Sequence, residues 1–186
     1  MLWFDGTNYF DYEEDFDYET EYAKMTESVN KYKGFFVGRY ETTIDNDRNI
    51  GSVYNTPVLT EDKTMFTKDS TDYPYRWYGM YYAQKTTDYI DGNGQNVQSA
   101  MIYGQLWDKV MAFVNGKTDG AGNTFNTSSY SSARHTGSKA NSGQNNNDLV
   151  ANIYDLEGNC YDWTQEANDT SSRVERRRQL LQWLFS

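Results

Sequence analysis

The sequence has little of what several protein classes require. It contains one cysteine, Cys160, one histidine, His135, and two prolines among 186 residues. A single cysteine excludes an internal disulfide framework and a cysteine-based zinc site. A single imidazole excludes a metal centre built on several histidines. No apolar run approaches the ~18 residues of a transmembrane helix, so we expect no membrane span.

Basic residues are also scarce. Lysine and arginine number 17 against 27 acidic residues, which gives a formal net charge of −10. Phosphate binding needs clustered basic side chains, so we expect no nucleic-acid partner. The N-terminus has neither a basic start nor an apolar stretch, so it is not predicted to be a signal peptide.

Aliphatic residues are few, but aromatic residues are many. Leu, Ile, Val and Phe together number 31, about a sixth of the chain, a proportion typical of disordered sequences. However, 17 Tyr, 9 Phe and 5 Trp are far more rings than disordered segments carry. Each ring can bury roughly 150–250 Å². We therefore predict a folded, loop-rich domain whose core includes rings with polar tips.

Residue spacing predicts a few regular elements. Apolar side chains repeat at helical spacing over 21–32 and over 105–114, and Asn115-Gly116 is a good stop for the second helix. Residues 35–43 are rich in β-formers and predict a strand. Residues 119–147 are dominated by Gly, Ser, Thr and Asn, and predict a surface excursion outside the core. The expected apolar faces consist of Tyr22, Met25, Val29 and Tyr32 in the first helix, and of Leu106, Trp107, Val110, Met111, Phe113 and Val114 in the second.

Residues 1–24 form a separate acidic segment. They carry eight acidic side chains and one lysine, interleaved with aromatic rings. Two interpretations stay open: a solvated tail, or an extended arm whose rings dock on the domain. We expect three parts in the chain: the arm or tail over 1–24, a domain over 25–176 and an aberrant tail over 177–186.

Two segments resemble the formylglycine-generating enzyme family, also called the sulfatase-modifying factor family. Residues 33–43, KGFFVGRYETT, resemble its opening strand F-x-I-G-K-Y-E-V-T. Residues 152–164, NIYDLEGNCYDWT, resemble its N-x-x-D-L-x-G-N-V-x-E-W-T motif, with Asp162 in place of Glu. Between them, residues 105–108 resemble a degraded form of the family's E-A-E-W-E helix. The similarity spans about Lys33 to Arg176.

The resemblance implies an α+β fold: an irregular, loop-rich variant of the C-type lectin-like domain. After the second motif the family continues R-V-x-R-G-G-S/N-Y/W, and Arg173–Arg176 match its start. The next residues can be encoded so that a one-base shift reads Gly-Gly-Asn-Tyr. We therefore expect a frameshift after Arg176 and a domain without its closing strands. The alternative is a basic amphipathic helix at the end of the chain.

The resemblance also implies one metal site. In the family's enzymes Ca²⁺ lies on the turn that the second motif forms. Carried over by position, Asp155 and Asp162 would give carboxylate oxygens, and Gly158 and Cys160 would give backbone carbonyl oxygens. Such hard oxygen ligands are those that Ca²⁺ takes. The alternative is a structural turn in which Asp155 caps backbone amides and Asp162 pairs with an arginine.

No catalytic residue is predicted within the chain. The family's catalytic cysteine pair lies in a later segment, and Cys160 occupies a position that is usually small and apolar, so we expect a buried, inert thiol. We interpret His135 as a loop histidine bonded to the backbone, because no motif ties a nucleophile or carboxylate to it. No copper site is identifiable. Trp107 and Trp163 are expected in the core.

These observations predict a non-catalytic binding or surface-display module of a bacterial or phage surface protein. Its ligand would be a surface protein or a glycan, and the resemblance implies an extracellular or cell-surface location. The alternative is a formylglycine-generating oxidase acting on substrate cysteine, whose catalytic segment is lost or out of frame.

Overall fold

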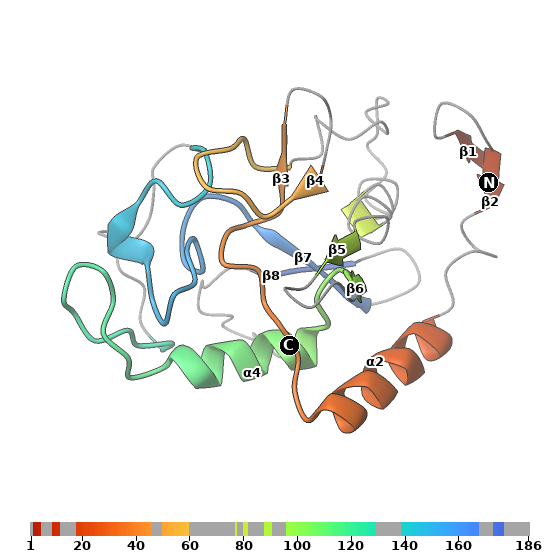
Figure 1. Ribbon diagram of the computed structural model, residues 1–186, viewed down its shortest axis with the longest axis horizontal. Coiled ribbons are helices and arrows are strands. Elements are labelled where there is room, and N and C mark those ends of the chain that lie inside the picture. Colours follow the sequence, from red (N-terminus) through yellow and green to blue (C-terminus); the bar gives the residue numbers. More distant parts are fainter. Residues whose placement is uncertain are drawn as a thin grey trace, which may run out of the picture.

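Figure 1 shows the computed structural model of the chain. It describes residues 2–4, 9–11, 18–45, 50–59, 77, 80–81, 88–90, 96–128, 139–167 and 173–176. These ranges contain two α-helices, α2 (Tyr18–Tyr32) and α4 (Gly104–Val114), and a short 3₁₀ turn, η2 (Asn146–Asp148). Residues 129–138, which include His135, and residues 177–186 lie outside this description, so the predictions made for them are not tested.

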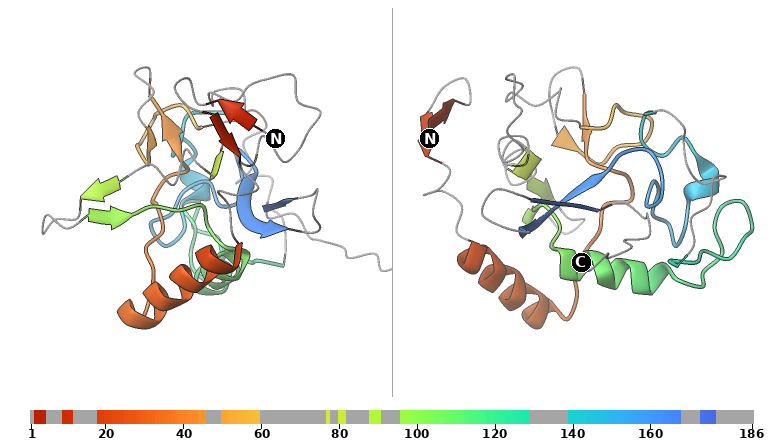
Figure 2. Two further views of the ribbon diagram at one scale, coloured as in Figure 1. Left: turned by 90° about the vertical axis from the view of Figure 1, so that its right-hand side faces the viewer. Right: turned by 180° about the vertical axis from the view of Figure 1, so that it is seen from behind.

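Helix α2 confirms the first predicted helix and begins earlier than 21, within the acidic segment 1–24. Tyr22, Met25 and Val29 are half-buried on one side, as the spacing predicts, but Tyr32 is 69% exposed. The helix lies on the outside of the molecule, beside the beginning of α4 (Figures 1 and 2). There the Tyr22 hydroxyl donates a hydrogen bond of 3.1 Å to Gln105 Oε1.

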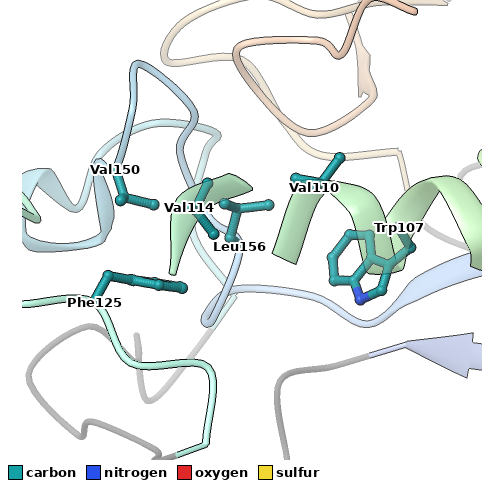
Figure 3. Close-up of a cluster of buried hydrophobic side chains, with 6 residues drawn as sticks. All are labelled: Trp107, Val110, Val114, Phe125, Val150 and Leu156. Carbon is teal, nitrogen blue, oxygen red and sulfur yellow. The ribbon is translucent and has the colours of Figure 1, made fainter. Parts of the chain in front are cut away.

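Helix α4 confirms the second predicted helix and carries the apolar core. Trp107, Val110 and Val114 are buried, and Figure 3 shows how they line up with residues from later in the chain. Phe113, predicted on the same face, is instead 57% exposed. The predicted stop is confirmed, because the helix ends at Val114 and Gly116 adopts a φ of +79°. The full cluster is Trp107, Val110, Val114, Phe125, Val150 and Leu156.

The described strands pair as four antiparallel two-stranded sheets. Near the N-terminus, β1 (Leu2–Phe4) pairs with β2 (Tyr9–Asp11), and β3 (Thr43–Ile44) pairs with β4 (Ile50–Gly51). Further along, β5 (Asp88–Ile90) pairs with β6 (Asn96–Gln98), and β7 (Asp162–Ala167) pairs with β8 (Arg173–Arg176).

Strand β7 crosses the molecule next to α4 and brings Trp163 into the interior (Figure 1). Its backbone is held from two directions. The Gln165 N–H donates to the Ile102 carbonyl at 3.0 Å, and the indole N–H of the buried Trp77 donates to the Thr164 carbonyl at 2.6 Å. Trp107 and Trp163 are both buried, as predicted.

The strand predicted over 35–43 is wrong for most of its length. Only Thr43 at its end belongs to a strand, and Phe36 is 92% exposed. The reason lies in the partners of the backbone around Tyr40. Its N–H and carbonyl oxygen both bond to the Ser52 hydroxyl, at 3.1 and 2.8 Å, so a side chain takes the place of a neighbouring strand.

The predicted surface excursion over 119–147 is also corrected where the structure describes it. Phe125 is fully buried in the core cluster, and Asp119 and Ser142 are buried as well. The Phe125 N–H and carbonyl bond to Lys117 and Gly116 at 2.7 Å each, which folds this segment back onto the end of α4. A polar composition therefore did not prevent one aromatic residue from anchoring the loop.

Both helices and strands are present, and the C-type lectin-like arrangement stays a prediction. In the described part of the chain, no helix is both long enough and apolar enough to cross a bilayer.

Candidate functional site

The two segments that carry the family resemblance lie against each other. The Tyr154 N–H donates to the Arg39 carbonyl at 2.9 Å, and the rings of Tyr40 and Tyr154 stack with their centroids 5.3 Å apart. The Glu41 carboxylate then accepts hydrogen bonds from the Asn159 side-chain amide at 2.5 Å and from the Cys160 N–H at 3.2 Å. One carboxylate thus bonds to two residues that follow it by 118 and 119 positions in the chain.

The second segment forms this junction because its backbone turns tightly. Ala151, Asn152, Asp155 and Asn159 all have positive φ, between 49° and 70°. Asn and Asp tolerate this conformation better than most residues, since their short polar side chains can bond locally. The Asn159 amide oxygen also accepts the Ala140 N–H at 2.9 Å, so its side chain links three parts of the chain.

Asp148 lies beneath this turn. Its side chain is fully buried, and its Oδ2 atom accepts long hydrogen bonds from the Glu157 and Gly158 N–H groups at 3.4 and 3.3 Å. Among the residues that the structure describes, the Oδ1 atom has no hydrogen-bond partner. Burial, with a further contribution from the nearby Asp155, raises the pKa of Asp148 to about 8. The carboxyl group therefore favours its protonated form at neutral pH.

Asp155, Asp162 and Glu41 form the other side of the same polar region. Asp155 is buried and its Oδ2 accepts the Gly143 N–H at 2.7 Å, while burial raises its pKa. Burial and the charge of Asp155 raise the pKa of Asp162 to about 7. Burial and the charges of Asp162 and Asp155 raise the pKa of Glu41 to about 9, against the opposing effect of its two hydrogen bonds. These carboxyl groups repel one another when ionised.

The structure brings together part of the set predicted to bind calcium. Asp155 and Asp162 are close enough for the charge of one to shift the pKa of the other, and Gly158 and Cys160 lie on the turn between them. Over the described ranges, no group of three or more His, Cys, Asp or Glu side chains is gathered tightly enough to hold a metal ion. The donor chemistry fits calcium only if backbone oxygens complete the set, as the resemblance implies.

One feature of the structural alternative is also present. The Asp155 carboxylate caps a backbone amide, although this amide belongs to Gly143 rather than to its own turn. In the backbone register of the β7–β8 pair Asp162 is the partner of Arg176, whose side chain lies outside the described part of the structure. Both the calcium interpretation and the structural interpretation therefore keep a basis in the geometry.

Cys160 is half-buried rather than fully buried. Burial, together with the neighbouring Glu41 charge, raises the pKa of its thiol to about 12. Because the thiolate is the nucleophilic form, this shift agrees with the prediction of an inert thiol.

The sequence did not predict an aromatic surface above this junction. The Tyr40 ring packs between the rings of Tyr154 and Tyr54, at centroid distances of 5.3 and 5.8 Å. The exposed Arg39 guanidinium lies 5.5 Å from the Tyr40 ring and 5.6 Å from the Tyr154 ring. We call Arg39, Tyr40, Tyr54 and Tyr154 the aromatic platform; Arg39 and Tyr54 are exposed, Tyr40 is half-buried and Tyr154 is buried. Its members come from three distant segments, so no spacing in the sequence could reveal it.

Comparison with known proteins does not identify the chain: no family model, no curated protein and no solved structure matches it.

Proposed function

We propose that this chain is a non-catalytic binding module of a bacterial or phage surface protein, with the aromatic platform as its binding surface. The observation that carries the proposal is the exposed residue Tyr54, 57% accessible, whose ring packs on Tyr40, while the Arg39 guanidinium lies over the same Tyr40 ring. Exposed aromatic and arginine side chains are enriched where proteins bind partners. A ring held against a neighbouring ring also loses little conformational freedom on binding.

The polar network below supports this assignment by explaining how the platform is held. Glu41 follows the platform residues Arg39 and Tyr40, and it bonds to the turn that carries Tyr154. The Glu41 carboxylate therefore holds the segment of Arg39 and Tyr40 against the turn that carries Tyr154. The thiol of Cys160, which donates its backbone N–H to Glu41, is a poor nucleophile because burial raises its pKa to about 12.

The binding function is tested with the full chain, labelled with a fluorophore, on immobilised cell-wall polysaccharide, mucin and extracellular matrix proteins. We expect saturable binding to at least one surface, competed by unlabelled chain and weakened at least tenfold in Arg39→Ala with unchanged melting temperature. Absence of saturable binding on every surface would contradict the proposal.

The alternative function is an oxidase that acts on substrate cysteine. It is tested by incubating the chain with a cysteine-containing peptide, copper and oxygen, and by mass spectrometry of the peptide. We expect unchanged peptide. Conversion of its cysteine to formylglycine would overturn the non-catalytic assignment.

We also propose that Ca²⁺ binds at Asp155 and Asp162, with carbonyl oxygens of Gly158 and Cys160 as further ligands. Its support is the cluster of carboxyl groups whose mutual repulsion a divalent cation would relieve. Thermal unfolding of the full chain is measured with EDTA and with millimolar CaCl₂. We expect a higher melting temperature with calcium, since binding to the folded state alone stabilises it.

Asp162→Asn should lose most of this calcium-dependent increase, whereas Asp108→Asn, an exposed position on α4, should retain it. An identical melting temperature with EDTA and with calcium would support the structural interpretation of the turn.

A further inference from the structure

Two loops beside the aromatic platform are joined along their backbones. The first follows β4 and the second contains Asn141–Gln144; they lie side by side in Figure 1, as the yellow-orange and cyan segments. The Asn55 N–H donates to the Ser142 carbonyl at 2.9 Å, and the Ser142 N–H donates to the Thr56 carbonyl at 3.0 Å. The Ser142 hydroxyl adds a bond of 2.5 Å to the Val53 carbonyl. The side chains on these loops are therefore held at fixed relative positions.

Gly143 sets how closely the second loop approaches the rings. It has a φ of +71°, and a Cβ atom there would lie 2.6 Å from Tyr40 Cε1 and 3.1 Å from Tyr54 Cδ2. Its N–H is anchored on Asp155 at 2.7 Å. The backbone thus supports the Tyr54 ring from one side and leaves the ring 57% exposed.

Asn55 follows Tyr54 in the chain and Gln144 follows Gly143, and these two amide side chains are oriented by each other. Gln144 Nε2 donates to Asn55 Oδ1 at 2.7 Å, and the Asn141 amide donates to the Asn55 carbonyl oxygen at 3.1 Å. Both Asn55 and Gln144 are exposed. Within the described part of the chain, no hydrogen bond occupies Asn55 Nδ2 or Gln144 Oε1. The surface therefore presents a donor on Asn55, the chain neighbour of Tyr54, and an acceptor on Gln144, whose side chain is hydrogen-bonded to that of Asn55.

We propose that Tyr54, Asn55 and Gln144 form a subsite for a neutral sugar ring, an inference that rests on the binding function above. A pyranose has a face of C–H groups, which packs on an aromatic ring, and adjacent hydroxyls that both donate and accept. The Tyr54 ring offers a surface for the C–H face, and the Asn55 and Gln144 amides offer partners for the hydroxyl groups. The two amides are uncharged, which suits hydroxyl groups better than a carboxylate or phosphate.

The size of the subsite also favours a sugar over a protein. A fully buried aromatic side chain accounts for roughly 150–250 Å², so a half-exposed Tyr54 offers on the order of 100 Å². A stable protein interface needs about 800 Å² on each partner. An area of this size suits a small ligand rather than a complete protein interface.

The test is titration of the full chain with neutral hexasaccharides built from glucose, mannose or N-acetylglucosamine, followed by calorimetry and ligand-observed NMR. We expect binding of at least one at micromolar to millimolar Kd. Tyr54→Ala should weaken it at least tenfold, whereas Tyr54→Phe, which keeps the ring, should stay within about threefold. Gln144→Ala should weaken it by about two- to tenfold, as expected for one neutral hydrogen bond.

Tyr32→Ala is the matched control, because Tyr32 is 69% exposed on α2, away from the platform. It should leave sugar binding unchanged, and circular dichroism should show that all the variants fold. Failure of every hexasaccharide to bind at millimolar concentration, or equal binding by Tyr54→Ala and the parent chain, would overturn the sugar assignment. If Arg39→Ala still abolishes binding to an immobilised protein in that case, the binding function stands and only the sugar class falls.

Discussion

The segment from Asp148 to Trp163 serves two regions that differ in chemistry. Val150 and Leu156 point into the apolar cluster around α4 (Figure 3), whereas Asp148 and Asp155 belong to the carboxyl-rich junction with Glu41. The apolar region is stabilised by removal of surface from water, an effect independent of pH. The carboxyl-rich region depends on protons, because its groups are buried with few compensating bonds. One short segment therefore couples a pH-independent core to a pH-dependent surface.

The largest effect is expected in the apolar region. Phe125→Ala removes a fully buried ring from the cluster and should cost about 3–5 kcal/mol of unfolding free energy. Phe113→Ala, on α4 but 57% exposed, is the matched control and should cost well under 1 kcal/mol. Urea unfolding followed by tryptophan fluorescence measures both. Equal losses in the two variants would contradict the assignment of Phe125 to the core.

A second prediction concerns the pH dependence of stability in EDTA. The folded-state pKa values of Glu41 and Asp148 are raised to about 9 and about 8, above those of the unfolded chain. The stability that these protons contribute is complete below the unfolded pKa values near 4, and it is lost as pH rises through 8 and 9. The unfolding free energy should therefore fall by up to about 1.4 kcal/mol per pH unit for each proton retained by the folded state.

Asp148→Asn separates this effect from the rest of the chain. The amide cannot ionise, so the variant should lose less stability than the parent chain between pH 5 and pH 9 and should exceed it at pH 9. Asp108→Asn, which removes an exposed carboxylate on α4, controls for net charge. Calorimetric melting temperatures across this range give the comparison. A parent chain more stable at pH 9 than at pH 5 would show that the junction is not protonated.

The sequence predicted local elements better than distant contacts. The spacing of Trp107, Val110 and Val114 identified α4, because a 3.6-residue period places these side chains on one face. The same spacing could not show that Phe113 is exposed, since an apolar residue at the edge of the apolar face can point toward the core or toward solvent. Phe125 was missed for the opposite reason: it is one ring within a polar segment, and only its contacts make it part of the core.

The candidate site shows the same limit. The prediction that Asp155 and Asp162 hold calcium together stays a prediction; in the structure Asp162 is the first residue of β7, and the charge of Asp155 contributes to raising its pKa. Their neighbour Glu41 was quoted only as part of a strand motif, although its hydrogen bonds reach Asn159 and Cys160 across more than a hundred residues. The 35–43 segment has β-formers, but among the described residues only Thr43 of this segment belongs to a strand, because Ser52 occupies the backbone groups of Tyr40. Propensity describes a residue's preference, and pairing decides whether that preference is met.

The smallest effect on stability is expected beside the aromatic platform. It is measured by comparing alanine substitutions at two glycines. Gly143→Ala and Gly116→Ala both place a side chain at positive φ, which costs about 1 kcal/mol at either position. At Gly116 no atom lies within 4 Å of the added Cβ, whereas at Gly143 the new atom would lie 2.6 Å from the Tyr40 ring. The difference in unfolding free energy should be about 1–2 kcal/mol, with Gly143→Ala the less stable variant. Tyrosine fluorescence should change only in Gly143→Ala, since only there must a ring shift. Equal costs at the two glycines would mean that the second loop does not support the platform, and the fixed geometry required for binding at Tyr54 would lose its basis.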